Sequence, residues 1–253
     1  MAWWKKLLGG EKKHAVIFMH AYPSEHGSDA EELSRLLQES GVLLVEMGHT
    51  HYNELASDGH TIYAATRSTG QVEEGPAGFS VTTVDDGVVS WKFKPIGDWP
   101  LVMVTSPADC RLITDPRSPT QVERGPIQVR ARVWGPSIAK VTIESDGGNA
   151  PMKSLDESTW SADWGTRLSN GLHVLTVTAL AADGRSGRDS ITVLVDRDGR
   201  YEPPPRRDVD YENALGAWPE KHILGTQLGP NENGRHWPSR RARKSPVSES
   251  QAR

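Results

Sequence analysis

The sequence HAVIFM at His14–Met19 and the sequence VLLVEM at Val42–Met47 decide the fold of the first part of the chain. Each is a short, continuous apolar run of the kind that forms a buried strand. Between them, residues 28–40 predict a helix that begins at a polar capping residue and stops before Gly41. A strand, a helix and a second strand in this order predict a small α/β unit.

Farther along the chain the pattern changes from continuous apolar runs to alternating strands. The segments Phe79–Val84 and Val88–Phe93 flank Asp85-Asp86-Gly87, which is a tight-turn signal. We therefore expect a hairpin here. Together with the strand–helix–strand unit, it predicts an α/β domain over residues 1–105.

Residues 106–199 carry only strand and turn signals. One face of the segment from Gln128 to Val133 is apolar and the other is charged, as in a half-buried strand. Regular spacing of such segments predicts an immunoglobulin-like β-sandwich, and the single cysteine, Cys110, excludes the antibody type with its paired cysteines. The candidate strands are Ile127–Val133, Ala139–Glu144, Thr159–Asp163, Leu172–Ala179 and Ser190–Val195.

The last region, residues 200–253, begins with three consecutive prolines and is rich in Pro, Arg and Asn. This composition predicts a mostly irregular, partly disordered tail. Within it, residues 217–237 contain two tryptophans and the pair Ile223-Leu224, so we expect this segment to dock on a neighbouring surface. The basic run Arg240–Lys244 is expected to be a solvated part of the tail.

Composition excludes several classes of protein. The chain has 29 Lys and Arg against 33 Asp and Glu, a net charge of −4, which gives no electrostatic case for a nucleic-acid binder. No stretch of about 18 apolar residues is present, so we expect no membrane-spanning helix. The first residues lack the apolar run of a secretory signal, and the whole chain has one cysteine. Both observations predict a cytoplasmic protein, unless a signal precedes this sequence.

Histidines follow both apolar strands. His20 comes directly after the first, and Gly48-His49-Thr50-His51 comes directly after the second. If the strands are parallel neighbours, both segments emerge at the edge where open α/β sheets build their sites. Imidazole there can bind a metal, act as an acid or base, or make a structural hydrogen bond, and Gly48 leaves room for the turn. The alternative is that these are polar loop residues or core histidines.

The stretch HAVIFMHAYPSE, followed by a helix and VLLVEMGHTH, resembles the C-terminal half of the calcineurin-like metallophosphoesterase family. The resemblance covers residues 1–95 and implies a partial α/β metallophosphoesterase sandwich that hydrolyses phosphate esters at a two-metal site. It implies that His20 and His49 bind one divalent ion and His51 the other, with Mn, Fe or Zn as the metal. Phe79 to Lys94 then resembles the closing hairpin of the family.

The chain also departs from the family pattern. The family carries an Asp-x-His, a further Asp and an Asn-His pair ahead of its lone histidine, but no Asp-x-His and no Gly-Asn-His precede His20 here. We therefore expect the carboxylate ligands and the leaving-group acid to be missing, the metal to be held incompletely and this chain alone to be inactive. The alternative function is a non-catalytic interaction protein that binds a protein partner through the β-sandwich.

Other candidate residues carry weaker signals. Tyr22 and His26 lie just beyond His20, where loop residues are more often solvated than part of a substrate pocket. His60 and His173 have no partner pattern. Trp160 and Trp164 are expected to pack in the sandwich rather than to form a sugar-binding platform. The sequence leaves the identity of the substrate open.

Overall fold

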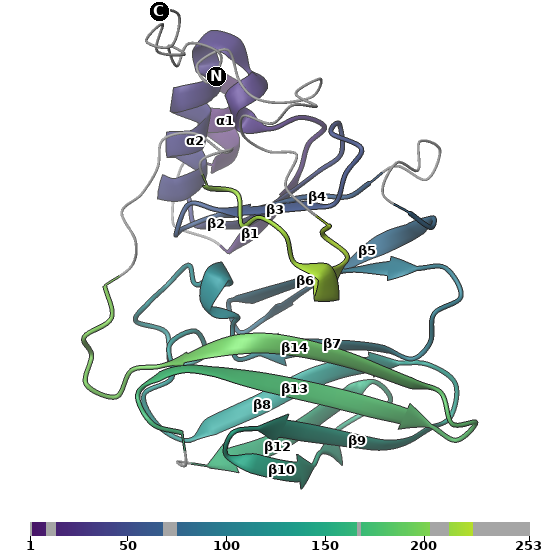
Figure 1. The fold of residues 1–253 in the computed structure, drawn as a ribbon. Helices are drawn as coiled ribbons and strands as arrows, with labels where there is room; N and C mark the ends of the chain where they lie inside the picture. The colour runs from purple at the N-terminus through teal and green to yellow at the C-terminus, as the bar shows by residue number, and fades with distance from the viewer. Residues whose placement is uncertain (1, 9–13, 68–74, 166–167, 203–212, 225–253) are drawn as a thin grey trace, which may run out of the picture.

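The computed structural model describes residues 2–8, 14–67, 75–165, 168–202 and 213–224 (Figure 1). Most of the regular structure is β-strand, with two short α-helices near the N-terminus. The strands form two packed layers in the first part of the chain and a sandwich in the second. The protein is therefore mostly β, with a smaller α/β element at its N-terminal end.

The first layer is a four-stranded sheet of order β1-β2-β4-β3, called here the helix-bearing sheet. Strand β1 is parallel to β2 and β2 is parallel to β4, whereas β3 is antiparallel to β4. Helices α1 and α2 cover one face of this sheet (Figure 1). The bounds are α1 Ala2–Leu8, β1 Ala15–Phe18, α2 Ala30–Glu39, β2 Val42–Met47, β3 Glu54–Ser57 and β4 Ile62–Ala65.

Helix α2 packs on the sheet through Leu33 and Leu37, which lie one turn apart and are buried. It follows a short 3₁₀ turn at Gly27–Asp29, and its end is marked by Gly41, which adopts a φ of 70°. Glycine adopts this left-handed conformation without the penalty that a Cβ imposes. The predicted helix over residues 28–40 is therefore confirmed, with its α-helical part beginning slightly later.

The second layer lies under the other face of the helix-bearing sheet. It is the hairpin of β5 (Gly78–Asp85) and β6 (Val88–Pro95), as the alternating pattern predicts. All residues of β6 are buried, and Trp91 and Phe93 pack against the underside of the sheet. The described part of the tail, residues 213–224, adds two buried side chains to the same core, Trp218 and Ile223.

The sandwich consists of two four-stranded sheets, β10-β9-β13-β14 and β11-β12-β8-β7. All five strands that alternation predicts are present. Strand β7 pairs with β8, so the sandwich begins one strand before the expected range of residues 106–199. The bounds are β7 Leu101–Ser106, β8 Ile127–Trp134, β9 Ile138–Ser145, β10 Gly148–Pro151, β11 Lys153–Ser154, β12 Thr159–Gly165, β13 Gly171–Ala181 and β14 Ser186–Val195.

A buried carboxylate joins the hairpin, the sandwich and the tail segment. Asp189 of β14 accepts hydrogen bonds from Lys221 Nζ at 2.8 Å, from Lys92 Nζ at 3.2 Å and from the backbone N–H of Val104 at 2.9 Å. Burial alone would raise the pKa of Asp189, but the two lysines lower it below its ordinary value. Because Lys92 lies on β6 and Lys221 on the tail segment, the carboxylate of Asp189 links three parts of the chain.

We expect Asp189→Asn to lower the free energy of unfolding by about 3–5 kcal/mol, because it leaves two buried ammonium groups without a counter-charge. Asp183→Asn is the matched control, since Asp183 pairs with Arg185 at an exposed turn and its loss should have no measurable effect. Urea unfolding of both variants measures the difference. Equal stability of Asp189→Asn and the wild type would contradict this role.

A second buried carboxyl, Glu123, lies where the loop before β8 meets β14. Its backbone N–H donates to Leu194 O at 2.9 Å, and its carbonyl accepts from the N–H of Asp196 at 2.8 Å. The side chain is only 5% exposed, and burial raises its pKa to about 7. The folded protein therefore favours the protonated form.

Since burial raises the pKa of Glu123 from 4.5 to about 7 in the folded state, its contribution to stability is fully present below about pH 4.5 and is lost as the pH rises to about 7. Relative to Glu123→Gln, the wild type should lose about 2–3 kcal/mol of unfolding free energy between pH 5 and pH 8. Parallel denaturant titrations of the two proteins measure this difference. A constant difference across that pH range would show that Glu123 does not titrate there.

Candidate metal site at the ends of strands β1 and β2

The parallel pairing of β1 with β2 continues past the ends of both strands. Met19 donates its backbone N–H to Glu46 O at 3.1 Å, and Gly48 donates to His20 O at 3.2 Å. The two loops that follow the strands are therefore held side by side. This is the arrangement that the sequence predicts for His20 and the Gly48–His51 segment.

The rings of His20 and His49, the histidine pair, are in contact. His20 Nε2 lies 3.2 Å from His49 Nδ1, and the ring centroids are 5.0 Å apart with the planes at 78°. The other nitrogen of His49, Nε2, lies 3.0 Å from Glu25 Oε2. A chain of three polar groups, Glu25–His49–His20, thus runs across the edge of the sheet.

Glu25 fixes the tautomer of His49. A carboxylate only accepts hydrogen bonds, so His49 carries its proton on Nε2 and presents the lone pair of Nδ1 to His20. Partial burial raises the pKa of Glu25, and its contact with His49 partly offsets that shift. Glu25 carries no motif signal of its own, and only its place in the short loop after His20 could have pointed to it.

The backbone of the H-x-H segment is strained. His49 has a φ of 65° and His51 a φ of 66°. The N–H of Thr50 donates to Gly48 O at 2.8 Å, which makes a γ-turn centred on His49. A non-glycine residue held in this region costs of the order of 1–3 kcal/mol and is typical of functional sites.

The turn does not depend on the room that Gly48 leaves. The positive φ angles fall on the two histidines instead. A Cβ at position 48 would lie 3.9 Å from His20 Nδ1, which is an ordinary contact. The tight turn therefore begins after Gly48, at His49.

His51 is half-buried and lies two residues beyond the histidine pair. In the described part of the chain, no group of three His, Cys, Asp or Glu side chains is placed to hold one metal ion. The structure thus brings His20 and His49 together as a pair. The assignment of His51 to a second ion remains a prediction of the family resemblance.

The weaker candidates are mostly structural. Tyr22 is fully buried in the core under α2 and is therefore not a solvated loop residue, while His26 and His60 are exposed. His173 is buried and bonds Asp146 at 2.7 Å and the carbonyl of Ser169 at 2.8 Å. Trp164 lies in the sandwich core, as predicted, and donates to Ser145 Oγ at 2.9 Å; Trp160 packs against that core.

No family model and no curated protein matches this chain. Among solved structures, an engineered protein is 26% identical over 39% of this chain and 20% of its own length, with a TM-score of 0.30. The endo-β-1,4-mannanase from Thermotoga petrophila is 14% identical over 77% of this chain and 50% of its own, with a TM-score of 0.34. CopC from Methylosinus trichosporium OB3b is 18% identical over 30% of this chain and 82% of its own length, with a TM-score of 0.24.

This chain spans half or less of the length of the first two of these structures. At such TM-scores the similarities identify neither a shared fold nor a shared function. Among the described residues, no helix is long and apolar enough to cross a membrane. The histidine pair and its surroundings are therefore the feature that points to a function.

Proposed function

We propose that this chain forms part of a metal-dependent phosphoesterase site in which His20 and His49 bind one divalent ion. The separation of 3.2 Å between His20 Nε2 and His49 Nδ1 carries this proposal. Two nitrogens bound to one tetrahedral ion at the usual bond lengths lie about 3.3 Å apart. The pair is therefore spaced for a shared ion, and binding would displace the proton of His20 Nε2.

Glu25 supports the same assignment. Histidines that ligate a metal usually donate their second ring N–H to a carboxylate or a carbonyl, which fixes the ring and raises its basicity. Glu25 lies at that position, 3.0 Å from His49 Nε2. Two imidazoles favour a borderline ion such as Zn or Fe, in keeping with the metals that the resemblance to calcineurin-like metallophosphoesterases implies.

A bound ion of this kind lowers the pKa of a ligated water and polarises a phosphoryl oxygen. His20 and His49 would hold that ion, and Glu25 would orient the ring of His49. By resemblance, His51 would hold a second one. A complete site needs carboxylate ligands and a leaving-group acid, and the sequence ahead of His20 contains none of the corresponding motifs.

A second candidate is an interaction protein that uses the sandwich. Its support is a set of exposed apolar side chains on the outer face of β13, where Leu172 is 61% exposed, Val174 56% and Leu180 42%. Residues two apart on a strand share one face, so Leu172 and Val174 are neighbours there, while Thr176 and Thr178 separate them from Leu180. Exposed apolar side chains that lie together are typical of a contact surface for another protein. Metal binding distinguishes the two candidates.

We expect the purified chain to bind one Zn ion, measured by calorimetry, and His20→Ala and His49→Ala to weaken this binding at least tenfold. Glu25→Gln should weaken it by about 10–100-fold, because the outer partner of a ligating histidine is lost. His60→Ala is the matched control, since His60 is exposed and lies outside the site. Zn binding that is equal in all these proteins would overturn the proposal.

The same proposal predicts little catalysis from the chain by itself. Hydrolysis of p-nitrophenyl phosphate with added Mn or Zn should be no faster than in His20→Ala, because several preorganised groups are missing and each is worth about 10²–10³ in rate. Inorganic phosphate should nevertheless bind to the Zn-loaded wild type and not to His20→Ala. Robust metal-dependent turnover lost in His20→Ala would show that other residues complete the site.

A further inference from the structure

The helix-bearing sheet is wider than the hairpin layer that packs under it. In the parallel register, Val16 of β1 lies beside Leu44 of β2, and Phe18 lies beside Glu46, so all four side chains point to the same face. Leu44 is fully buried under the hairpin, whereas Phe18 is 80% exposed and Val16 is 39% exposed. The second layer therefore ends before it reaches β1.

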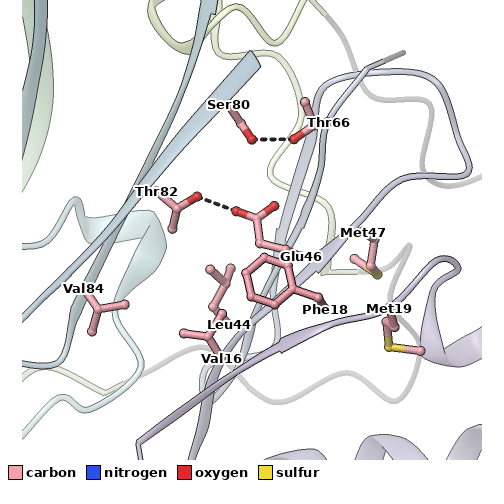
Figure 2. Close-up of a pocket in the computed structure, with 10 residues that line it drawn as sticks. All are labelled: Val16, Phe18, Met19, Leu44, Glu46, Met47, Thr66, Ser80, Thr82 and Val84. Carbon is pink, nitrogen blue, oxygen red and sulfur yellow. Dashed lines mark hydrogen bonds between the residues drawn. The ribbon is translucent and has the colours of Figure 1, made fainter. Parts of the chain in front are cut away.

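Because the hairpin does not extend under β1, a groove lies between the two layers. It is called here the β5 groove. It has a volume of about 660 Å³, with side chains of β1 and β2 on one wall and Ser80, Thr82 and Val84 of β5 on the other (Figure 2). Thr66 Oγ1 donates to Ser80 Oγ at 2.7 Å, and Thr82 Oγ1 donates to Glu46, so the layers are held together beside the groove.

Strand β5 has a free edge on the side away from β6. In the part of the chain described, it pairs only with β6. Just before β5, the carbonyl of Ala77 accepts the N–H of Ile96, so the peptide groups of residue 77 face β6. Because peptide groups alternate in direction along a strand, those of residues 80, 82 and 84 face the free edge. The residues that line the groove thus also present unpaired backbone groups.

Glu46 determines the charge that the groove accepts. It sits among apolar side chains, and burial raises its pKa although the Thr82 hydroxyl partly offsets that shift. Among the described residues, no Lys, Arg or His forms an ion pair with it. A second copy of this chain docked about a two-fold axis would bring another Glu46 to the interface and repeat the uncompensated charge. The groove therefore favours a different chain that carries a basic side chain.

We propose that the β5 groove binds an extended segment of a partner polypeptide, which adds as a strand to the free edge of β5. Its alternate apolar side chains would cover Val16 and Phe18, and a lysine or arginine between them would pair with Glu46. Backbone pairing supplies affinity in this mode of recognition, and the side-chain positions supply specificity. The interaction does not depend on metal binding at the histidine pair.

Selection from a phage-displayed library of random 12-residue peptides tests this inference. Enriched peptides should alternate apolar and polar residues and contain Lys or Arg, and their synthetic forms should bind the wild-type chain in solution. Phe18→Glu and Glu46→Gln should each weaken binding at least tenfold. Val84→Pro should do the same, because it removes an edge N–H without disturbing the pairing with β6. Leu155→Glu, in the sandwich, is the matched control, since Leu155 is exposed and lies outside the groove.

Three outcomes would overturn the inference. The first is that no peptide is enriched on the wild-type chain. The second is that enriched peptides bind Phe18→Glu as tightly as they bind the wild type. Phe18 is 80% exposed, so this substitution removes no core contact. The third is that the chain self-associates in solution through Phe18, which would make a second copy the occupant of the groove.

Discussion

The parallel pairing of β1 with β2 is the constraint on which the site depends. It forces the two strands to end at the same edge of the sheet, and its last hydrogen bonds, Met19 to Glu46 and Gly48 to His20, hold the following loops together. The contact between His20 and His49 follows from that pairing, because both residues come directly after the hydrogen-bonded segments. Glu25 then holds Nε2 of His49 at 3.0 Å, which directs Nδ1 of the same ring toward His20.

Two carboxylates differ in whether basic side chains pair with them. Asp189 is buried and pairs with the ammonium groups of Lys92 and Lys221, which lie in different parts of the chain. Glu46 has one hydroxyl partner and sits in an apolar groove beside the exposed Phe18. A partly buried charge without a counter-charge is costly, so a partner that brings a basic side chain to the groove would stabilise it.

Much of this architecture follows from hydrophobic periodicity. The continuous run at Val42–Met47 and the alternating strands of the sandwich are confirmed because burial of apolar faces decides them. Strand β7 was not predicted, since the segment at Leu101–Ser106 has no alternation to separate it from the preceding loop. The role of Glu25 and the burial of Lys92 depend on three-dimensional neighbours, and no local pattern distinguishes these side chains from solvated ones.

The central claim is that His20 Nε2 and His49 Nδ1 bind the same ion. Long-range ¹H–¹⁵N NMR correlation of the histidine rings during a Zn titration tests it most directly. The account predicts that the resonances of these two nitrogens move together to the shifts of metal-bound imidazole, while Nε2 of His49 keeps its proton toward Glu25. Coordination through His49 Nε2, or no change at either ring, would contradict it.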